Sequence, residues 1–248
     1  MNNFFLHEFW GIFIATVRIL GVVSFMPGFS EQSVPYRIRI LVAASFGWIL
    51  SFTLRITLPP HFMGIVMICG IELLTGVFLG LILKIVFSIF EIAGSIMSQL
   101  SGLSNVMVTN IDGFDQSSIL GQFFNVSGVL VFFIFDLHHL VFQGMFHSYQ
   151  LFPVADLNVL YAGGEFMTHT VSQGFYHSVQ FAMPFLIFGT IVYLAMGIMN
   201  KLIPQIQVFF ISMPLQIFIG WIVMLFSMGA ILMTFPNVFS EIWEGWMK

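Results

Sequence analysis

The sequence predicts an all-α, polytopic hydrophobic helical protein. Of its 248 residues, 58% are hydrophobic and only 7% are charged, whereas a soluble domain carries about 25% charged residues. The apolar residues gather in runs close to the roughly 20 residues that a transmembrane helix needs. Segments that contain proline, glycine or both separate these runs. We therefore expect an integral membrane protein or a subunit buried in a larger assembly.

Six apolar runs predict the helices. They span about residues 9–26, 38–58, 62–100, 119–135, 179–199 and 208–235. The third keeps helical character to about residue 100 and is too long for one membrane span. The fourth continues, with polar interruptions, to about residue 152. Trp243 and Trp246 follow the sixth run, which is typical of an interfacial anchor or of a seam between proteins.

Charge and cysteine content limit the possible functions. The net charge is −4 and there is no basic tract, so the sequence lacks the electrostatic footprint of a nucleic-acid-binding protein. Cys69 is the only cysteine, which excludes an internal disulfide and a cysteine-based metal site. We expect no cleaved signal peptide. Arg37, Arg39, Lys84 and Lys201 fall on one side of the six-span arrangement, and Arg55 and Lys248 on the other. This favours a cytoplasmic location for the first side and puts both termini outside.

A polar stripe marks the end of the third run. Its five residues are spaced four, three, four and three apart, which keeps them on one face of a helix. A charge at the centre of a bilayer costs roughly 2.5–3.5 kcal/mol, so this face should not meet lipid. It either lines a hydrated conduit or subunit groove, or is a seam where small residues let helices pack closely. The residues of this polar face are Lys84, Ser88, Glu91, Ser95 and Ser98.

Residues 101–118, SGLSNVMVTNIDGFDQSS, interrupt the apolar sequence. Gly102 and Gly113 permit unusual backbone dihedrals, and Met107 is adaptable packing material. Long loops in compact proteins are usually functional or disordered. Residues 101–118 therefore either have a function of their own or form an ordinary long loop on the cytoplasmic face.

Histidines near the middle of the chain raise the question of a metal or haem site. Asp136, His138, His139 and His147 lie close in sequence. Adjacent histidines point about 100° apart on a helix, and no second histidine lies four residues from either. We therefore predict no metal site and no cofactor. No catalytic cluster can be argued from spacing, so we predict that the protein is not an enzyme.

Three blocks of the sequence resemble the FliR family, the flagellar member of the type III protein-export gate. The first is RILGVVSFMPGFSEQSVPYRIRI, with Arg18, Gly21 and two prolines before Arg37 and Arg39. The second is Asp136-Leu-His-His followed by Ser148-Tyr149 and Leu-Phe-Pro153. The third and most specific is NKLIPQIQVFFISMPLQIFIG. Lys201 stands where the family often has Arg. Gln216 stands where many relatives, especially those of virulence systems, have Lys, which favours a flagellar assignment.

The resemblance implies long, kinked helical hairpins: a FliP-like part over residues 1–178 fused to a FliQ-like hairpin over residues 179–248. It implies assembly with FliP- and FliQ-like subunits, contact with FlhB and FlhA, and passage of unfolded rod, hook and filament proteins at the bacterial inner membrane. The segment at about 101–118 would plug the closed channel through Val106, Met107, Ile111, Gly113 and Phe114. The cytoplasmic loop would contact a partner through Lys201, Pro204, Gln205, Gln207 and Phe209.

A polytopic transporter of small molecules or ions is the main alternative function. It would share the hydropathy, the polar face and the proline-broken helices. It would also predict an inverted repeat between the two halves of the chain, and the sequence shows none.

Overall fold

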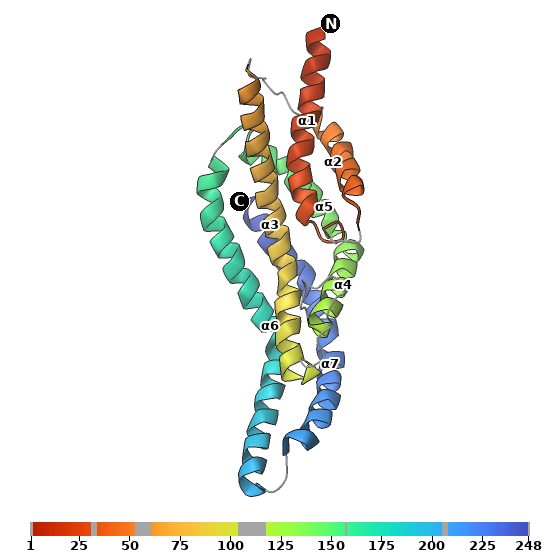
Figure 1. Ribbon diagram of the computed structural model, residues 1–248, viewed down its shortest axis with the longest axis vertical. Coiled ribbons are helices and arrows are strands. Elements are labelled where there is room, and N and C mark those ends of the chain that lie inside the picture. Colours follow the sequence, from red (N-terminus) through yellow and green to blue (C-terminus); the bar gives the residue numbers. More distant parts are fainter. Residues whose placement is uncertain are drawn as a thin grey trace. The chain divides into compact units, whose positions relative to one another are not determined.

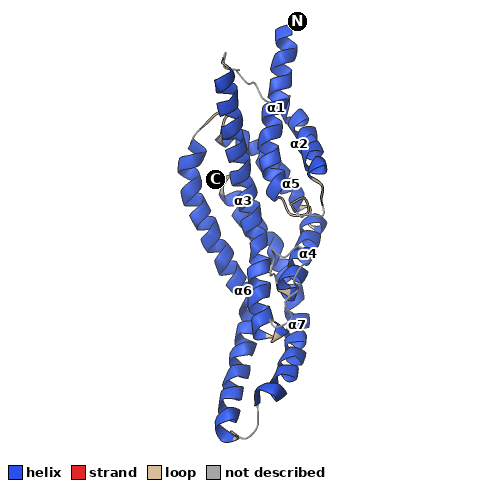
Figure 2. Ribbon diagram, viewed as in Figure 1, coloured by secondary structure: helices blue, strands red, loops and turns tan. Residues whose placement is uncertain are grey.

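The computed structural model describes residues 2–30, 34–52, 61–103, 118–156, 158–204 and 208–247. Within these residues the chain forms seven α-helices and no strand (Figures 1 and 2). This confirms the all-α prediction. The helices are α1 (Asn2–Phe25), α2 (Tyr36–Ser51), α3 (Phe62–Leu100), α4 (Ile119–Ile134), α5 (Leu137–Leu151), α6 (Asn158–Leu202) and α7 (Val208–Gly245).

Three helices are much longer than a bilayer requires. α3, α6 and α7 contain 39, 45 and 38 residues, so each is at least about 57 Å long at 1.5 Å per residue. The hydrocarbon core of a bilayer is only about 30 Å thick. Among the described residues these three helices could cross a membrane, and the broken pair of α4 and α5 adds a fourth candidate if it is one span.

Hydropathy alone misplaced several helix ends. The first two runs form α1 and α2, but α2 ends at Ser51 rather than near residue 58. α6 begins at Asn158, well before the apolar run at residue 179, although the stretch before this run contains Gly163 and Gly164, which are poor helix formers. Proline does not end α6 or α7, which contain Pro184, Pro214 and Pro236. Among the described residues, three helices, or four if the bent pair is one span, could cross a membrane, instead of the expected six.

The helices contribute to two compact units. The first combines Met1–Val86, Asp136–Val171 and Ser240–Lys248, and the second combines Phe87–Phe135 and Ser172–Phe239. α3, α6 and α7 each enter both units. The expected boundary between residues 178 and 179 lies inside α6, and the division into a FliP-like part and a FliQ-like hairpin stays a prediction.

Glycines let α1 lie close to α3 in the first unit. A Cβ atom added to Gly21 would lie 2.7 Å from the backbone of Gly76 and Val77. One added to Gly76 would meet the carbonyl oxygen of Arg18. Real Cβ atoms do not come this near to backbone, so any larger residue at these positions pushes the two helices apart.

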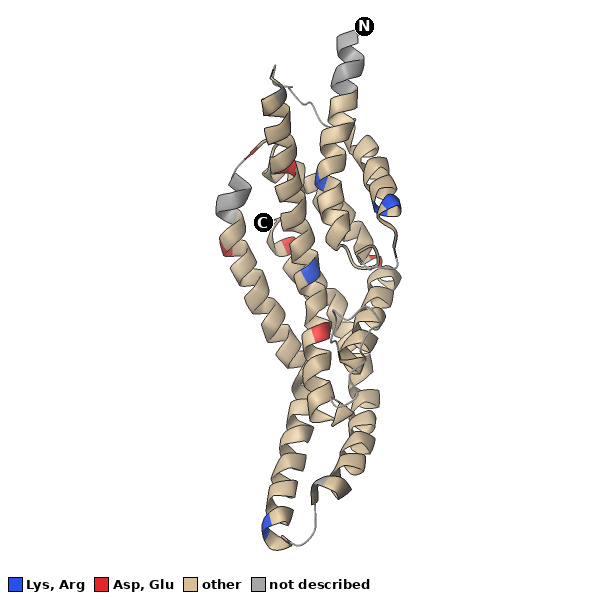
Figure 3. Cartoon of the chain, viewed as in Figure 1, with Lys and Arg blue, Asp and Glu red and all other residues tan. Residues whose placement is uncertain are grey.

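A buried ion pair lies at this crossing. Charged side chains are sparse along the helices (Figure 3), yet Arg18 is 2% and Glu72 0% exposed. Arg18 donates from Nε to Glu72 Oε2 at 2.6 Å and from Nη2 to Glu72 Oε1 at 2.9 Å. A guanidinium and a carboxylate joined by two parallel bonds form the strongest common type of protein hydrogen bond.

The rest of the guanidinium is also bonded. Nη2 donates to the carbonyl oxygen of Phe152 at 3.0 Å, and Nη1 donates to Ser148 Oγ at 3.3 Å. The guanidinium carbon lies 3.8 Å from the ring centroid of Tyr149, over the ring face. These three partners come from α5 and the residue immediately after it. Arg18 therefore connects α1 to α3 and to the end of α5.

The Glu72 carboxylate has a further partner in the turn after α5. The backbone amide of Ala155 donates to Glu72 Oε1 at 3.2 Å. Ala155 has a φ of 69°, a left-handed conformation that is uncommon for a residue other than glycine. The ion pair thus fixes the path of the chain between α5 and α6 as well as the helix crossing.

The C-terminal tryptophans lie inside the protein. Trp243 is 0% exposed and Trp246 7%, and the Trp243 indole donates to the carbonyl oxygen of Leu140 at 2.9 Å. Gly144 leaves room for the indole, since a Cβ there would lie 2.7 Å from its Cζ2 atom. The interpretation of these residues as an interfacial anchor is therefore wrong: they pack α7 against α5 within the first unit.

Phenylalanine rings fill the centre of the second unit. Phe90 of α3 lies 4.4 Å, between ring centroids, from Phe235 of α7 and 6.0 Å from Phe181 of α6. Such ring pairs add about 0.5–1.5 kcal/mol each beyond the burial of their area. Four helices therefore meet at this cluster, whose rings are Phe87, Phe90, Phe124, Phe132, Phe181, Phe235 and Phe239.

We predict that Glu72→Ala destabilises the protein strongly, because it leaves the Arg18 guanidinium buried without its counter-ion. Loss of one partner of a buried pair costs about 3–5 kcal/mol. Thermal unfolding of the protein, purified with its natural partners in mild detergent, measures this loss. Glu165→Ala is the matched control, because Glu165 is an exposed carboxylate on α6. The double variant Arg18→Met with Glu72→Leu should recover most of the loss. Equal unfolding midpoints for Glu72→Ala and Glu165→Ala would contradict the assignment.

Candidate functional site

The polar face of α3 is less covered than the face opposite to it. Lys84 and Glu91 are exposed, Ser88 and Ser95 are partly exposed, and only Ser98 is buried. The side chains of the opposite face are buried except that of Ile96, which is partly exposed. The buried ones are Val86, Phe87, Ile89, Phe90 and Met97. The periodicity in the sequence therefore identified the less covered side of the helix. Whether this side lines a conduit or a subunit groove stays a prediction.

Lys84 and Ser98, at the two ends of the polar face, differ in their contacts. The Lys84 ammonium lies 5.9 Å from the ring centroid of Phe25, within the range of a cation–π contact. The Ser98 hydroxyl is buried, and it has no hydrogen-bond partner among the described residues. A buried polar group without a partner costs about 1–3 kcal/mol. One end of the polar face thus carries an exposed cation and the other an unsatisfied hydroxyl.

The C-terminal end of α3 is held by a side chain of α7. Gln216 is 6% exposed, and its Nε2 donates to the carbonyl oxygen of Leu100 at 2.6 Å. The last four carbonyls of a helix have no partner within the helix, so this bond supplies one from outside. The sequence singled out Gln216 as a departure from many relatives but gave no indication of this role.

The backbone after α3 is tightly surrounded within the second unit. Gly102 has a φ of 74°, and a Cβ there would lie 3.7 Å from the Gln216 amide carbon. A Cβ on Gly220 would lie 2.8 Å from the Ser101 Cβ, and one on Gly189 would lie 2.6 Å from a Leu100 methyl carbon. The positive φ at Gly102 confirms the unusual dihedral expected there. α6 and α7 together therefore hold the point from which the chain continues into residue 104.

The expected plug lies outside the described residues, as does the centre of the expected contact loop. The plug residues are Val106, Met107, Ile111, Gly113 and Phe114, and the loop residues are Gln205 and Gln207. Beside that loop, Lys201 in the last turn of α6 and Pro204 after the helix are exposed. Phe209 belongs to α7, but its side chain is not among those described.

The sequence did not predict the Arg18–Glu72 pair or its hydrogen-bond partners. Arg18, Ser148 and Tyr149 belong to the blocks that resemble the family, and Glu72 is a charged residue inside an apolar run. The one indication in the sequence was the presence of two opposite charges inside apolar helices, because each such charge needs a partner. Spacing along the chain could not identify that partner, because 54 residues separate Arg18 from Glu72.

We predict that the Gln216 bond stabilises the end of α3. Gln216→Glu keeps the shape of the side chain but replaces the donor with a carboxylate that faces the Leu100 carbonyl. It should cost at least about 1–3 kcal/mol, the usual cost of leaving a buried group unsatisfied. Gln216→Lys supplies a donor again and is the matched control. Unfolding of the purified assembly, together with limited proteolysis after residue 103, measures the effect. If Gln216→Glu behaves like the unaltered protein in both assays, the bond has no such role.

Comparison with known proteins gives one family across the chain. The family model described as "Bacterial export proteins, family 1" matches residues 9–242. The chain is 31% identical to the flagellar biosynthetic protein FliR of Buchnera aphidicola subsp. Schizaphis graminum, with 95% of this chain and 88% of the relative covered. It is 29% identical to FliR of Aquifex aeolicus (94% and 91% covered) and 28% identical to FliR of Caulobacter vibrioides (91% of each). The match includes both sides of the buried ion pair, the polar face of α3 and the Gln216 contact, and the chain therefore belongs to family 1 of the bacterial export proteins.

Proposed function

We propose that this chain is a subunit of the flagellar type III protein export gate, and that it forms part of the channel for unfolded rod, hook and filament proteins. The family match over residues 9–242 carries this conclusion. Relatives named for flagellar biosynthesis match it over nearly their whole length. The family and its flagellar relatives, together with the apolar helices, place it at the bacterial inner membrane, in the export apparatus of the flagellar basal body. No catalytic residue and no cofactor belongs to this proposal.

Exposed apolar surface supports assembly with other subunits. In the most apolar stretches of α6 and α7 only 22% of the residues are buried, against 50% in α3. Large apolar patches on a protein surface mark contact with other proteins or with lipid. On α6, large apolar side chains are exposed from Val171 to Leu202, which is about 47 Å of helix at 1.5 Å per residue. A hydrocarbon core about 30 Å thick cannot cover all of this surface. FliP- and FliQ-like subunits of a hetero-oligomer are the proposed neighbours.

The transporter alternative has less support. A transporter needs polar or charged groups near the bilayer midplane that are open to a substrate. The most deeply buried charges here, Arg18 and Glu72, bond to each other and to their own chain. They therefore act as a structural pair, and the family match points to protein export instead.

The connection between α6 and α7 is the proposed contact with FlhB or FlhA. α6 ends at Leu202 and α7 begins at Val208, so the hairpin turns over a short stretch. Lys201 and Pro204 are exposed beside it. Gln205, Gln207 and Phe209 complete the proposed contact, on the strength of the resemblance to the cytoplasmic loop of FliR proteins.

Residues 104–116 are the proposed plug of the closed channel. The support is the composition of the segment and the structure on either side of it. Before the segment, Leu100 and Gly102 are held by α6 and α7. After it, the Ser118 hydroxyl accepts a hydrogen bond from the Gly121 amide at 3.0 Å and caps α4. We expect both attachments to remain when the segment between them is shortened.

Complementation tests the function. A strain that lacks this chain should secrete no hook or filament protein and should not swim, and the full chain should restore both. A transporter would instead leave flagellar secretion intact, and that result would overturn the proposal.

In the same strain, a chain shortened within residues 104–116 should still copurify with its partners but should let ions leak across the membrane. A tight membrane with normal swimming would show that the segment is not the plug, and loss of assembly would show that it is structural.

A further inference from the structure

Asp136, His138 and His139 lie together where α4 gives way to α5. α4 ends at Ile134 and α5 begins at Leu137. Between them, Asp136 has a φ of 56°, a left-handed conformation in which Asp is one of the few tolerated residues. The His139 amide donates to the Asp136 carbonyl oxygen at 2.9 Å. This turn brings the Asp136 side chain back toward the two histidine rings just after it in the chain.

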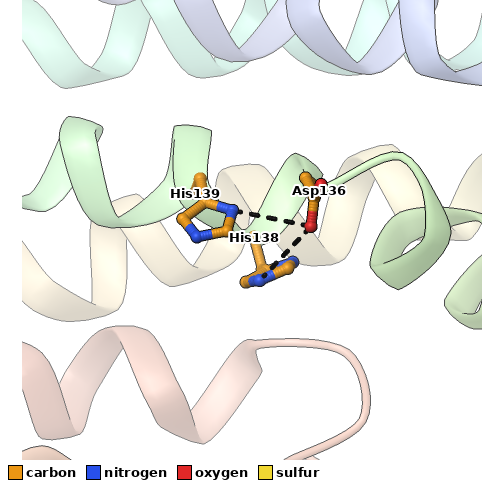
Figure 4. Close-up of side chains that lie close together, drawn as sticks. All are labelled: Asp136, His138 and His139. Atoms are coloured by element: carbon orange, nitrogen blue, oxygen red, sulfur yellow. Dashed lines mark ion pairs between the residues drawn. The ribbon is translucent and has the colours of Figure 1, made fainter.

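The three side chains converge on a common point (Figure 4). Asp136 Oδ1 lies 3.9 Å from His138 Nε2 and 3.7 Å from His139 Nδ1. One ligand atom from each residue lies within 4.8 Å of the other two. The two imidazole rings are 4.2 Å apart between centroids. The sequence predicted no metal site here, because adjacent histidines on a regular helix diverge. In the structure, however, the start of the helix and the left-handed residue before it bring the two rings together.

These distances suit a shared cation better than direct hydrogen bonds. Both Asp136–His separations exceed the usual range of about 2.7–3.2 Å. Two ligands at about 2.1 Å from one Zn²⁺, at an angle of about 110–130°, lie about 3.4–3.8 Å apart. The Asp136 side chain also makes no capping hydrogen bond to α5, although Asp is a preferred N-cap residue that commonly does so. Its carboxylate is instead directed at the imidazoles.

We propose that Asp136, His138 and His139 bind a divalent transition-metal ion of the zinc class. Two imidazole nitrogens and one carboxylate oxygen form a donor set that such ions favour and that Mg²⁺ and Ca²⁺ do not. Three protein ligands leave a position for water or for a ligand from a neighbouring subunit. Neither the family match nor the proposed export function assigns a role to these three residues.

The surroundings fit a metal site at the protein surface. His138 is 22% exposed, and its ring meets Phe142 edge-on, with 6.0 Å between centroids. Phe142 in turn stacks on Phe46 of α2 at 4.4 Å. His138 is thus held in place, while Asp136 and His139, at 72% and 65% exposed, are open to an incoming ion and free to adjust. A bound ion would clamp the left-handed turn at the start of α5.

Zinc binding to the purified assembly tests the proposal. The assembly is isolated through a tag without histidine, stripped with a chelator, and titrated with Zn²⁺ against a chromogenic competitor. We expect one Zn²⁺ per copy of this chain that Mg²⁺ does not displace, and a higher unfolding midpoint with Zn²⁺ present. His139→Ala and Asp136→Asn should each weaken this binding at least 10-fold, since even changes to the residues that orient metal ligands weaken binding about 10–100-fold.

His169→Ala is the control, because His169 is another exposed histidine, on α6. It should keep the full affinity and the shift of the unfolding midpoint. Copurification of partners with each variant shows that the assembly is intact, which is expected because the altered side chains are exposed. The proposal is wrong if less than one Zn²⁺ binds per chain, or if His139→Ala and His169→Ala bind Zn²⁺ equally. In that case the three residues form only a polar cluster at a helix start.

Discussion

The buried pair of Arg18 and Glu72 constrains most of the first unit. In an apolar chain, each of these charges is tolerated only while the other is beside it, because an isolated buried charge costs several kcal/mol. The pair forms because α1 and α3 can approach at Gly21 and Gly76. Each glycine lies three or four residues after its charged neighbour, on the same face of the helix. The charge and the close packing are therefore one feature of the crossing.

The same pair determines the path of the chain beyond α5. Ser148 and Phe152 complete the hydrogen bonding of the guanidinium, and Ala155 adopts a left-handed conformation while its amide bonds Glu72. The end of α5 and the turn before α6 are thus fixed by groups buried near α1. These buried polar bonds specify how α1, α3 and α5 lie together in the first unit, which apolar packing alone defines poorly.

Part of this could be predicted from the sequence. Composition and run length indicated the helical class, the extent of α3 to Leu100 and the turn between α6 and α7. Period-3.6 spacing identified the less covered face of α3, and Gly102 was expected to need an unusual dihedral. Helix ends were less predictable, because hydropathy detects apolar residues and not the point where a helix stops. The partners of Glu72, Gln216 and Asp136 could not be predicted, because each depends on contacts or backbone dihedrals that spacing along the chain does not reveal.

Helices this long and this apolar need cover on most sides. The structure gives the most apolar stretches of α6 and α7 little cover from their own chain, and a bilayer is too thin to cover all the exposed apolar side chains of α6 from Val171 to Leu202. An assembly of export-gate subunits would supply it, and in such an assembly the hydropathy of this chain records contact with protein as much as with lipid. The polar face of α3 would then meet a lumen or a subunit groove, where Lys84 and Glu91 keep contact with water.

Native mass measurement of the complex purified through this chain is the most direct test of such an assembly. We expect a hetero-oligomer that contains FliP- and FliQ-like subunits, and a chain that aggregates or is rapidly degraded when it is produced alone. A monodisperse, protease-resistant monomer in mild detergent would contradict this, because the exposed faces of α6 and α7 would then need no protein partner.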